Sequence, residues 1–241
     1  MTDLRPETSP PIEAVLFDFS GTLFRLEEDD SWFAGMELDS SLSPAQSREV
    51  DGHVQAELMR RLTAPTGRSV SMTPEALEAW MNRDLAPHLH REAYLHVLRE
   101  SGLAHHHAEA LYAHVIDPSC WTPYPDTGPV LAGLRRRGVT TAVVSNIAFD
   151  LRPAFDPLGG GVDEFVLSFE VGAVKPDPVI FQTALDRLGV AADRALMVGD
   201  SDEADGGARA LGCRFALVDP LPTRERRDGL IAALWAHGLQ V

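Results

Sequence analysis

Four short segments that lie far apart in the chain contain residues that can do chemistry. In each segment these residues follow a run of apolar residues. Asp18 lies in FDFSGTLF, Ser145 in VVSN, Lys175 in VGAVKPDP, and Asp200 with Asp205 in VGDSDEAD. A carboxylate such as that of Asp18 can attack phosphorus and form an aspartyl-phosphate, which splits one difficult transfer into two easier ones. Because carboxylate and phosphate are both anions, the attack needs a cation. Oxygen ligands from Asp18 and Asp200 suit Mg²⁺, which binds few carboxylates and keeps several waters.

Other residues of these segments predict how a phosphoryl group would be held. Lys175, the chain's single lysine, offers a positive charge, and Ser145 offers a hydroxyl donor. Gly21 leaves room for the phosphoryl group, the Thr22 hydroxyl can orient the loop of Asp18, and Asp205 can hold a metal-bound water. The predicted substrate-binding set is therefore Gly21, Thr22, Ser145, Asn146 and Lys175.

Alternating strand and helix patterns would bring these residues together. Apolar runs typical of buried parallel strands cover residues 14–17, 140–144, 164–167, 195–198 and 214–218. Helical patterns lie between them: Asp126 is placed to cap a helix that stops at Gly138, and Asp177-Pro178 opens another that stops at Gly189. This alternation predicts an α/β fold with a doubly wound parallel sheet, whose ligand crevice lies at the carboxyl ends of the strands.

Residues 26–122 break the alternation and contain only helical patterns, for instance from Ser43-Pro44 to Leu62 and from Thr73-Pro74 to Leu85. We therefore expect a core of residues 12–25 and 123–241 with an inserted all-helical domain at 26–122. Because the insertion follows the first strand, both of its ends must return to the mouth of the crevice, where it is well placed to act as a lid. Trp32, close to the first loop, is the aromatic residue that we expect over the crevice.

Taken together, the four segments resemble the haloacid dehalogenase superfamily over about residues 12–219. The resemblance implies a Rossmann-like core, a helical cap, and in most members a Mg²⁺-dependent phosphatase with an aspartate nucleophile. Carried onto this chain, it implies that the backbone carbonyl of Ser20 is a further metal ligand. The expected metal set is Asp18, Ser20, Asp200 and Asp205, and the expected catalytic set is Asp18, Ser20, Ser145 and Lys175.

One position departs from the pattern of the family. Its phosphatases usually carry a second Asp two positions after the nucleophile, which protonates the leaving alcohol, and here that position is Ser20. General acid–base help is worth about 10²–10⁴-fold, so hydrolysis of alkyl phosphates should suffer. Three explanations stay open: a substrate with a good leaving group, another acid supplied by the cap, or a chain that binds phosphate ligands and turns over poorly.

The same substitution keeps other reactions in view. Haloacid dehalogenases of the superfamily also lack the second Asp, attack carbon and need no metal, but they do not need the GDS…D segment that is present here. A metal-independent 2-haloacid dehalogenase is thus a minority alternative, beside a catalytically weak phosphate-binding or regulatory protein. Phosphonoacetaldehyde hydrolases use a cap lysine, which the cap of this chain does not contain.

Net charge and the length of the apolar runs argue against two classes of partner, nucleic acids and membranes. The formal net charge of −15 repels a phosphate backbone, so nucleic acid is not an expected partner. The longest apolar run, residues 230–236, is far too short to cross a membrane, and the beginning of the chain lacks the pattern of a secretory signal. We expect a cytoplasmic hydrolase that acts on a small phosphorylated metabolite, and a homodimer is compatible with this interpretation.

Overall fold

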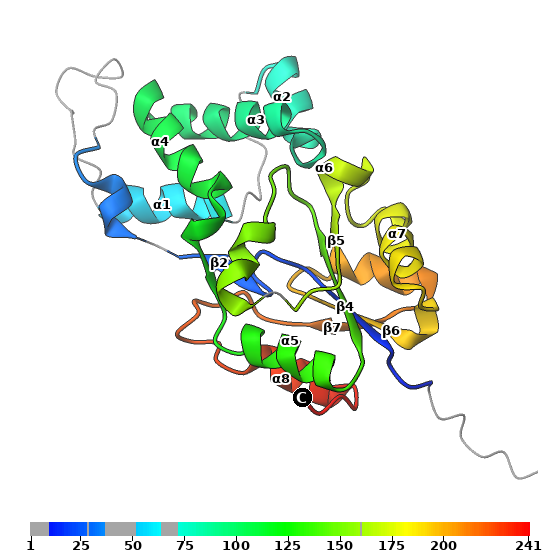
Figure 1. Cartoon of the computed structure of the whole chain (residues 1–241). Coiled ribbons are helices and arrows are strands. Elements are labelled where there is room, and N and C mark those ends of the chain that lie inside the picture. The colour runs from blue at the N-terminus through cyan, green and yellow to red at the C-terminus, as the bar shows by residue number, and fades with distance from the viewer. Residues whose placement is uncertain (1–9, 28, 37–51, 64–71, 160) are drawn as a thin grey trace, which may run out of the picture.

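The computed structural model describes residues 10–27, 29–36, 52–63, 72–159 and 161–241. Its centre is a parallel sheet with the strand order β5-β4-β1-β6-β7 (Figure 1). The strands are β1 (Ala14–Phe17), β4 (Thr140–Ser145), β5 (Glu164–Leu167), β6 (Ala195–Gly199) and β7 (Arg214–Leu217). Each of the expected strands is present to within one residue. The order places β1 in the middle, with the ends of β4 and β6 on either side of it.

Alternate side chains of β1 explain why helices cover both faces of the sheet. Val15 and Phe17 pack into a cluster with residues of α5 (Thr127–Arg136) and α8 (Gly229–Ala236). Ala14 and Leu16 point to the opposite face and pack against α7 (Pro178–Leu188). All four β1 residues are fully buried, as expected for a central parallel strand. The fold is therefore the predicted α/β arrangement with a parallel sheet flanked by helices on both faces (Figure 1).

The predicted capping residues behave differently from each other. Asp177 accepts a hydrogen bond from the backbone N–H of Val179 and caps α7 as expected. The prediction for Asp126 was wrong, because its side chain makes no capping bond to α5. Its Oδ2 instead accepts from the N–H of Leu230 at 2.8 Å, in the first turn of α8. A sequence pattern sees only the local helix, whereas Asp126 joins two helices far apart in the chain.

The inserted segment forms a helical layer with its own buried cluster, to which Leu58, Leu98 and Leu111 belong. The described helices are α1 (Gly52–Thr63), α2 (Pro74–Met81), α3 (Pro87–Glu100) and α4 (His105–Ile116), with shorter 3₁₀ turns η1 (Asp30–Phe33), η3 (Arg83–Leu85) and η4 (Pro118–Cys120). Thr73 caps α2 as the sequence predicts. The predicted helix start at Ser43-Pro44 lies outside the described residues.

A two-stranded ribbon, which the sequence did not predict, joins the two parts. β2 (Phe24–Leu26) runs antiparallel to β3 (Trp121–Pro123), so the chain leaves the core and returns to it side by side. The expected limits of the insertion, near residues 26 and 122, fall on this ribbon. Strands of only three residues carry too little periodicity to be recognised in a sequence.

Three of the remaining short elements follow strands of the sheet: η5 (Arg152–Leu158) comes after β4, α6 (Ser168–Val171) after β5 and η7 (Asp205–Leu211) after β6. The fourth, η6 (Ala192–Arg194), directly precedes β6.

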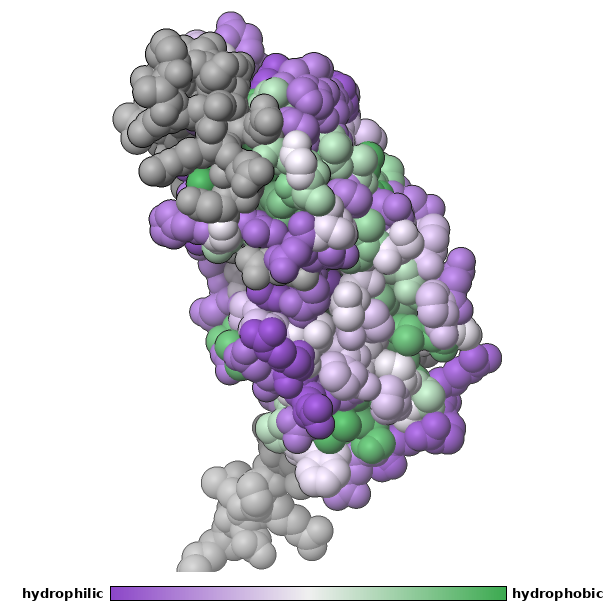
Figure 2. Space-filling model, turned by 90° about the vertical axis from the view of Figure 1, so that its left-hand side faces the viewer, coloured by the Kyte–Doolittle hydropathy of each residue, from purple (hydrophilic) through white to green (hydrophobic). Residues whose placement is uncertain are grey.

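The described helices and one face of the molecule show how hydrophobic residues are distributed. No described helix has the length and hydropathy needed to span a membrane. The face drawn in Figure 2 is largely hydrophilic, with hydrophobic residues in separate patches. Large exposed hydrophobic residues such as Met81 and Trp235 lie in different helices, α2 and α8.

Candidate active site

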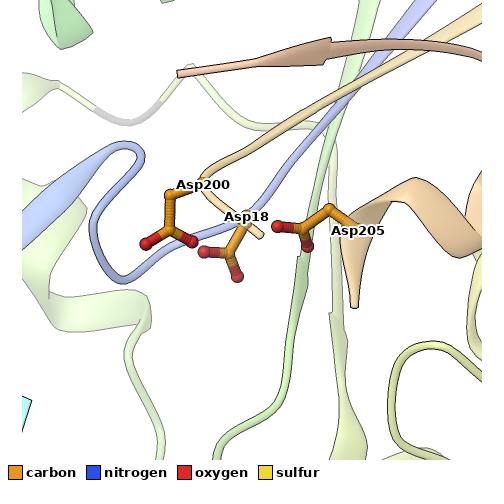
Figure 3. Close-up of side chains that lie close together, drawn as sticks. All are labelled: Asp18, Asp200 and Asp205. Atoms are coloured by element: carbon orange, nitrogen blue, oxygen red, sulfur yellow. The ribbon is translucent and has the colours of Figure 1, made fainter. Parts of the chain in front are cut away.

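Three carboxylates meet at the carboxyl edge of the sheet. Asp18 follows β1, Asp200 follows β6, and Asp205 begins η7. Because β1 and β6 are neighbours in the sheet, their ends bring Asp18 and Asp200 together. Ligand oxygens of the three residues lie within 4.8 Å of one another, and Asp18 lies between the other two (Figure 3). The sequence prediction placed these residues at one edge, and the structure brings them to one point.

Lys175 lies between two of these carboxylates. Its Nζ donates to Oδ1 of Asp18 at 2.5 Å and to Oδ1 of Asp205 at 2.6 Å. The three side chains are nearly inaccessible, with exposed fractions of 3%, 9% and 1% for Lys175, Asp18 and Asp205. Burial alone would lower the pKa of Lys175, but the two carboxylates outweigh it and hold that pKa above its ordinary value. The side chain is therefore a fixed ammonium beside the proposed nucleophile.

Asn146 positions this lysine through its backbone. The Lys175 N–H donates to Oδ1 of Asn146 at 2.7 Å, and Nδ2 of Asn146 donates to the Lys175 carbonyl at 3.0 Å. The sequence placed Asn146 among the substrate-binding residues. In the structure Asn146 lines the cavity, and its amide also holds the loop that carries Lys175 against the end of β4. A pair of side-chain-to-backbone bonds across 29 residues has no local sequence signature.

Two glycines leave space for the acidic side chains. Gly21 has φ +74°, and a Cβ there would lie 2.3 Å from Oδ2 of Asp200. The sequence predicted that Gly21 makes room for the phosphoryl group, but the adjacent space holds the Asp200 carboxylate. A Cβ at Gly199 would lie 2.1 Å from Oδ2 of Asp205. Both positions thus admit only glycine if the carboxylates are to keep their places.

The loop after β1 is held by hydrogen bonds from its own Thr22 and from Arg226, which lies far away in the sequence. The Thr22 hydroxyl donates to Oδ2 of Asp18 at 3.4 Å, in line with its expected orienting role. Arg226, only 5% exposed, donates to the carbonyl oxygens of Gly21 at 2.7 Å and of Thr22. Its guanidinium stacks on the ring of Tyr124. Sequence reasoning missed Arg226, since it lies in a polar segment without a recognisable motif.

The electrostatics of the cluster fit a divalent cation. Burial, together with the charges of Asp205 and Asp200, outweighs the attraction of Lys175 and raises the pKa of Asp18 to about 7. Burial and then the charge of Asp205 raise the pKa of Asp200 to about 6. Three carboxylates and one ammonium leave this site short of positive charge. A hard cation that accepts oxygen ligands, such as Mg²⁺, would offset that deficit.

Both oxygens of Asp205 accept hydrogen bonds from the protein. Its Oδ1 accepts from Lys175, and its Oδ2 accepts from the N–H of Ser201 at 3.0 Å. Asp18 likewise accepts from Lys175 and, at the longer distance of 3.4 Å, from Thr22. The expectation that Asp205 acts on a metal through water stays a prediction.

A cavity of about 310 Å³ opens beside the cluster, between core and cap. The core contributes Asp18, Ser20, Asn146, Lys175, Asp200 and Asp205 to its wall. Ser145, which is 2% exposed at the end of β4, is not among the residues that line it. The structure therefore brings most of the predicted residues to one cavity, whereas Gly21, Thr22 and Ser145 are not among the residues that line it.

The cap side of this cavity is formed by residues that the sequence analysis did not select. They are Leu62, Arg83, Asp84, His90, Tyr94 and Val115, with Trp121 from the ribbon. The prediction for Trp32 was wrong: its ring stacks on His114 at 4.4 Å between centroids and packs against the cap cluster. Trp121 takes the position at the cavity instead.

Comparison with known proteins identifies the family. Residues 12–212 match the family model described as haloacid dehalogenase-like hydrolase. The chain belongs to this family. Within the haloacid dehalogenase-like hydrolases, it is 36% identical over 150 residues to a phosphoserine phosphatase of Thermus thermophilus, an alignment that covers 60% of this chain and 58% of that protein.

Other relatives extend over more of the chain. The haloacid dehalogenase-like hydrolase domain-containing protein 3 of Danio rerio is 29% identical over 91% of this chain and 87% of its own length. An (S)-2-haloacid dehalogenase of Pseudomonas putida is 26% identical over 90% of this chain and 95% of its own length. Among solved structures, a dehalogenase matches with a TM-score of 0.61 at 24% identity, covering 86% of this chain and 84% of that chain, which shows a common fold. By contrast, the alignment with the Thermus protein covers less than two thirds of that protein, 58% of its length.

Proposed function

We propose that this haloacid dehalogenase-like hydrolase is a Mg²⁺-dependent phosphatase that acts on a small phosphorylated metabolite through an aspartyl-phosphate on Asp18. The observation that carries the proposal is the convergence of Asp18, Asp200, Asp205 and the ammonium of Lys175 at one buried point of the cavity wall. Similarity to a phosphoserine phosphatase supports the phosphatase class. The volume of about 310 Å³ suits a small substrate.

Each residue would have a distinct task. Asp18 attacks phosphorus, and Lys175 lowers the repulsion between this carboxylate and the phosphoryl oxygens. Asn146 and Thr22 hold the two reacting loops in place through the hydrogen bonds already described. Asp18, Asp200 and the Ser20 carbonyl would hold Mg²⁺, with Asp205 acting through water. The ion supplies charge stabilisation for the transferring oxygens.

A metal-independent 2-haloacid dehalogenase is the second candidate, and two observations favour it. Ser20 replaces the acid that a phosphatase of the family usually has, and the Pseudomonas putida relative is similar over nearly its whole length. In that reaction Asp18 would attack the carbon that carries the halogen, and halide would leave. The acidic cluster weighs against this candidate, because a reaction that uses no cation does not need the partly buried Asp200 carboxylate beside Asp18.

One set of assays separates the candidates. We expect phosphate release from an aryl phosphate to require Mg²⁺ and to disappear in Asp18→Asn, while the exposed Asp156→Asn retains it. Chloride release from 2-chloropropionate without metal would replace the phosphatase proposal by the dehalogenase one. Activity on neither substrate, together with binding of inorganic phosphate, would indicate a phosphate-binding or regulatory protein.

A further inference from the structure

When an alkyl phosphate is cleaved, the leaving alcohol needs a proton. The core residues that line the cavity do not offer a side chain suited to donate it. The leaving alkoxide is strongly basic, so a positioned acid accelerates its departure by about 10²–10⁴-fold. Lys175 is bound by two carboxylates, and Ser20 offers only a weakly acidic hydroxyl. A donor must reach the cavity from another element.

Asp84 contributes a carboxyl group to the cap wall of the same cavity. It lies in η3 of the cap and lines the cavity together with Asp18 and Lys175. Its side chain is 17% exposed. Burial raises its pKa above the ordinary value, although the charges of Arg83 and Lys175 act in the opposite direction. The protonated form of Asp84 is therefore more populated than that of an exposed aspartate.

A chain of hydrogen bonds fixes η3 relative to the loop of Lys175. The fully buried Ser168 hydroxyl donates to the Asp84 carbonyl at 2.5 Å and accepts from the Ile147 N–H at 2.9 Å. Ile147 directly follows Asn146, which holds the backbone of Lys175. The cap acid and the core lysine are thus attached to the same short segment after β4. This connection fixes the backbone of η3 at Asp84 relative to the loop of Lys175.

We propose that Asp84 is the general acid of this enzyme and takes over the task for which Ser20 is unsuited. The assignment rests on the proposed phosphatase function. An oxygen of Asp18 bonds to phosphorus while the bond from phosphorus to the leaving oxygen breaks, and that oxygen takes the proton of Asp84. Water then attacks the aspartyl-phosphate and gives a proton to the Asp84 carboxylate. Phosphate leaves, and both aspartates regain their starting forms.

The groups around Asp84 are compatible with this role. Nε of Arg83 lies 3.7 Å from Oδ2 of Asp84, and the charge of Lys175 reaches it from the core. From α3, His90 and Tyr94 face the cavity; burial lowers the pKa of His90 to about 3 and raises that of Tyr94, so both are neutral. In α6, which also packs against η3, Glu170 is bound to Arg152. Asp84 is therefore the carboxyl group that the described cap residues present to the cavity.

Substrates with different leaving groups test the assignment. 2,4-Dinitrophenyl phosphate releases an acidic phenol that needs no proton, whereas an alkyl phosphate such as β-glycerophosphate does. We expect Asp84→Asn to lose about 10²-fold or more in kcat/KM on the alkyl phosphate and no more than a few-fold on the dinitrophenyl ester. The double variant Ser20→Asp/Asp84→Asn should regain alkyl-phosphate hydrolysis, because the acid returns on the core side. Asp156→Asn, an exposed Asp-to-Asn change, is the matched control.

The outcomes distinguish this inference from the function beneath it. Equal losses on both substrates, or no loss on the alkyl phosphate, would overturn the role of Asp84 while leaving the phosphatase intact. A wild-type protein without Mg²⁺-dependent turnover of the dinitrophenyl ester would overturn the proposed function and the role of Asp84 with it. Thermal unfolding of each variant shows whether it is folded, and Asp84→Glu, which keeps the acid, should retain more alkyl-phosphatase activity than Asp84→Asn.

Discussion

The two walls of the cavity are built on different principles. On the core side, charged groups are buried and fixed by short loops at adjacent strand ends, as shown by Lys175 between Asp18 and Asp205. On the cap side, the wall consists of aromatic and partly buried residues such as Tyr94 and Trp121, supported by a separate hydrophobic cluster. If the proposed function is correct, the core wall attacks the phosphoryl group, and the cap wall contacts the rest of the substrate and supplies the acid for its leaving group. Changes in the core should affect every substrate, whereas changes in the cap should depend on the substrate.

Replacement of Lys175 by Met is the strongest test of the core wall. It leaves Asp18 and Asp205 buried without their cation, which costs about 3–5 kcal/mol of unfolding free energy in metal-free buffer. The ammonium is present throughout the neutral range because the folded-state pKa of Lys175 is raised. Loss of a charged donor at the reacting oxygens should also reduce kcat about 10²–10³-fold on every substrate. Denaturant titration and steady-state kinetics measure the two effects.

Arg152→Met is the control for Lys175→Met. It removes a cation that pairs with two solvent-accessible carboxylates, Asp150 and Glu170, and should cost about 1 kcal/mol or less. Similar costs for the two variants would mean that the core wall is no more tightly coupled than the surface.

A second test compares two glycines with the same backbone conformation. Gly21→Ala and Gly35→Ala both place a side chain at positive φ, +74° and +73°, and both should lose about 1–2 kcal/mol of stability. Only at Gly21 would the new Cβ meet Asp200; no described atom lies within 4 Å of a Cβ at Gly35. We therefore expect Gly21→Ala to need at least about tenfold more Mg²⁺ for half-maximal activity, roughly 1.4 kcal/mol of lost binding energy. An unchanged Mg²⁺ requirement would argue against Asp200 as a ligand.

The difference between the walls also explains which site residues could be predicted from the sequence: those of the core wall could, and those of the cap wall could not. Asp18 and Asp200 each follow a run of apolar residues, and the ends of neighbouring parallel strands meet, so their proximity follows from local patterns. Asp84 lies in a three-residue 3₁₀ turn whose position depends on the packing of η3 against α3 and α6. Trp121 and Trp32 are equivalent as sequence signals, and only the ribbon pairing places Trp121 at the cavity. Arg226 acts across about 200 residues, beyond any local pattern.

A third test moves the acid from the cap wall to the core wall. In the Asp84→Asn background, Ser20→Asp should raise kcat/KM for alkyl phosphates at least about tenfold, which is less than the roughly 10²–10⁴-fold that a fully positioned acid contributes. Ser20→Asn, which has a similar shape but no acidic proton, should give no such gain. Dinitrophenyl phosphate hydrolysis should change little in either variant, because its leaving group needs no proton. Equal effects of Asp and Asn would show that position 20 acts through shape rather than through proton transfer.

The last test concerns the stability of the cap wall and a buried histidine. Burial, assisted by Arg83, lowers the pKa of His90 to about 3, and its Nδ1 lies 3.0 Å from the Tyr112 hydroxyl. Below pH 6.5 the unfolded chain therefore binds a proton that the folded chain does not, so stability falls as the pH decreases from 6.5 toward 3. The slope reaches at most about 1.4 kcal/mol per pH unit. His90→Gln should flatten this slope in denaturant titrations between about pH 4 and 7, a range that includes the ordinary histidine pKa of roughly 6.5. His88→Gln, at an exposed position of the same helix, is the control and should leave the slope unchanged. If His90→Gln also leaves it unchanged, His90 is not the source of the loss of stability at low pH.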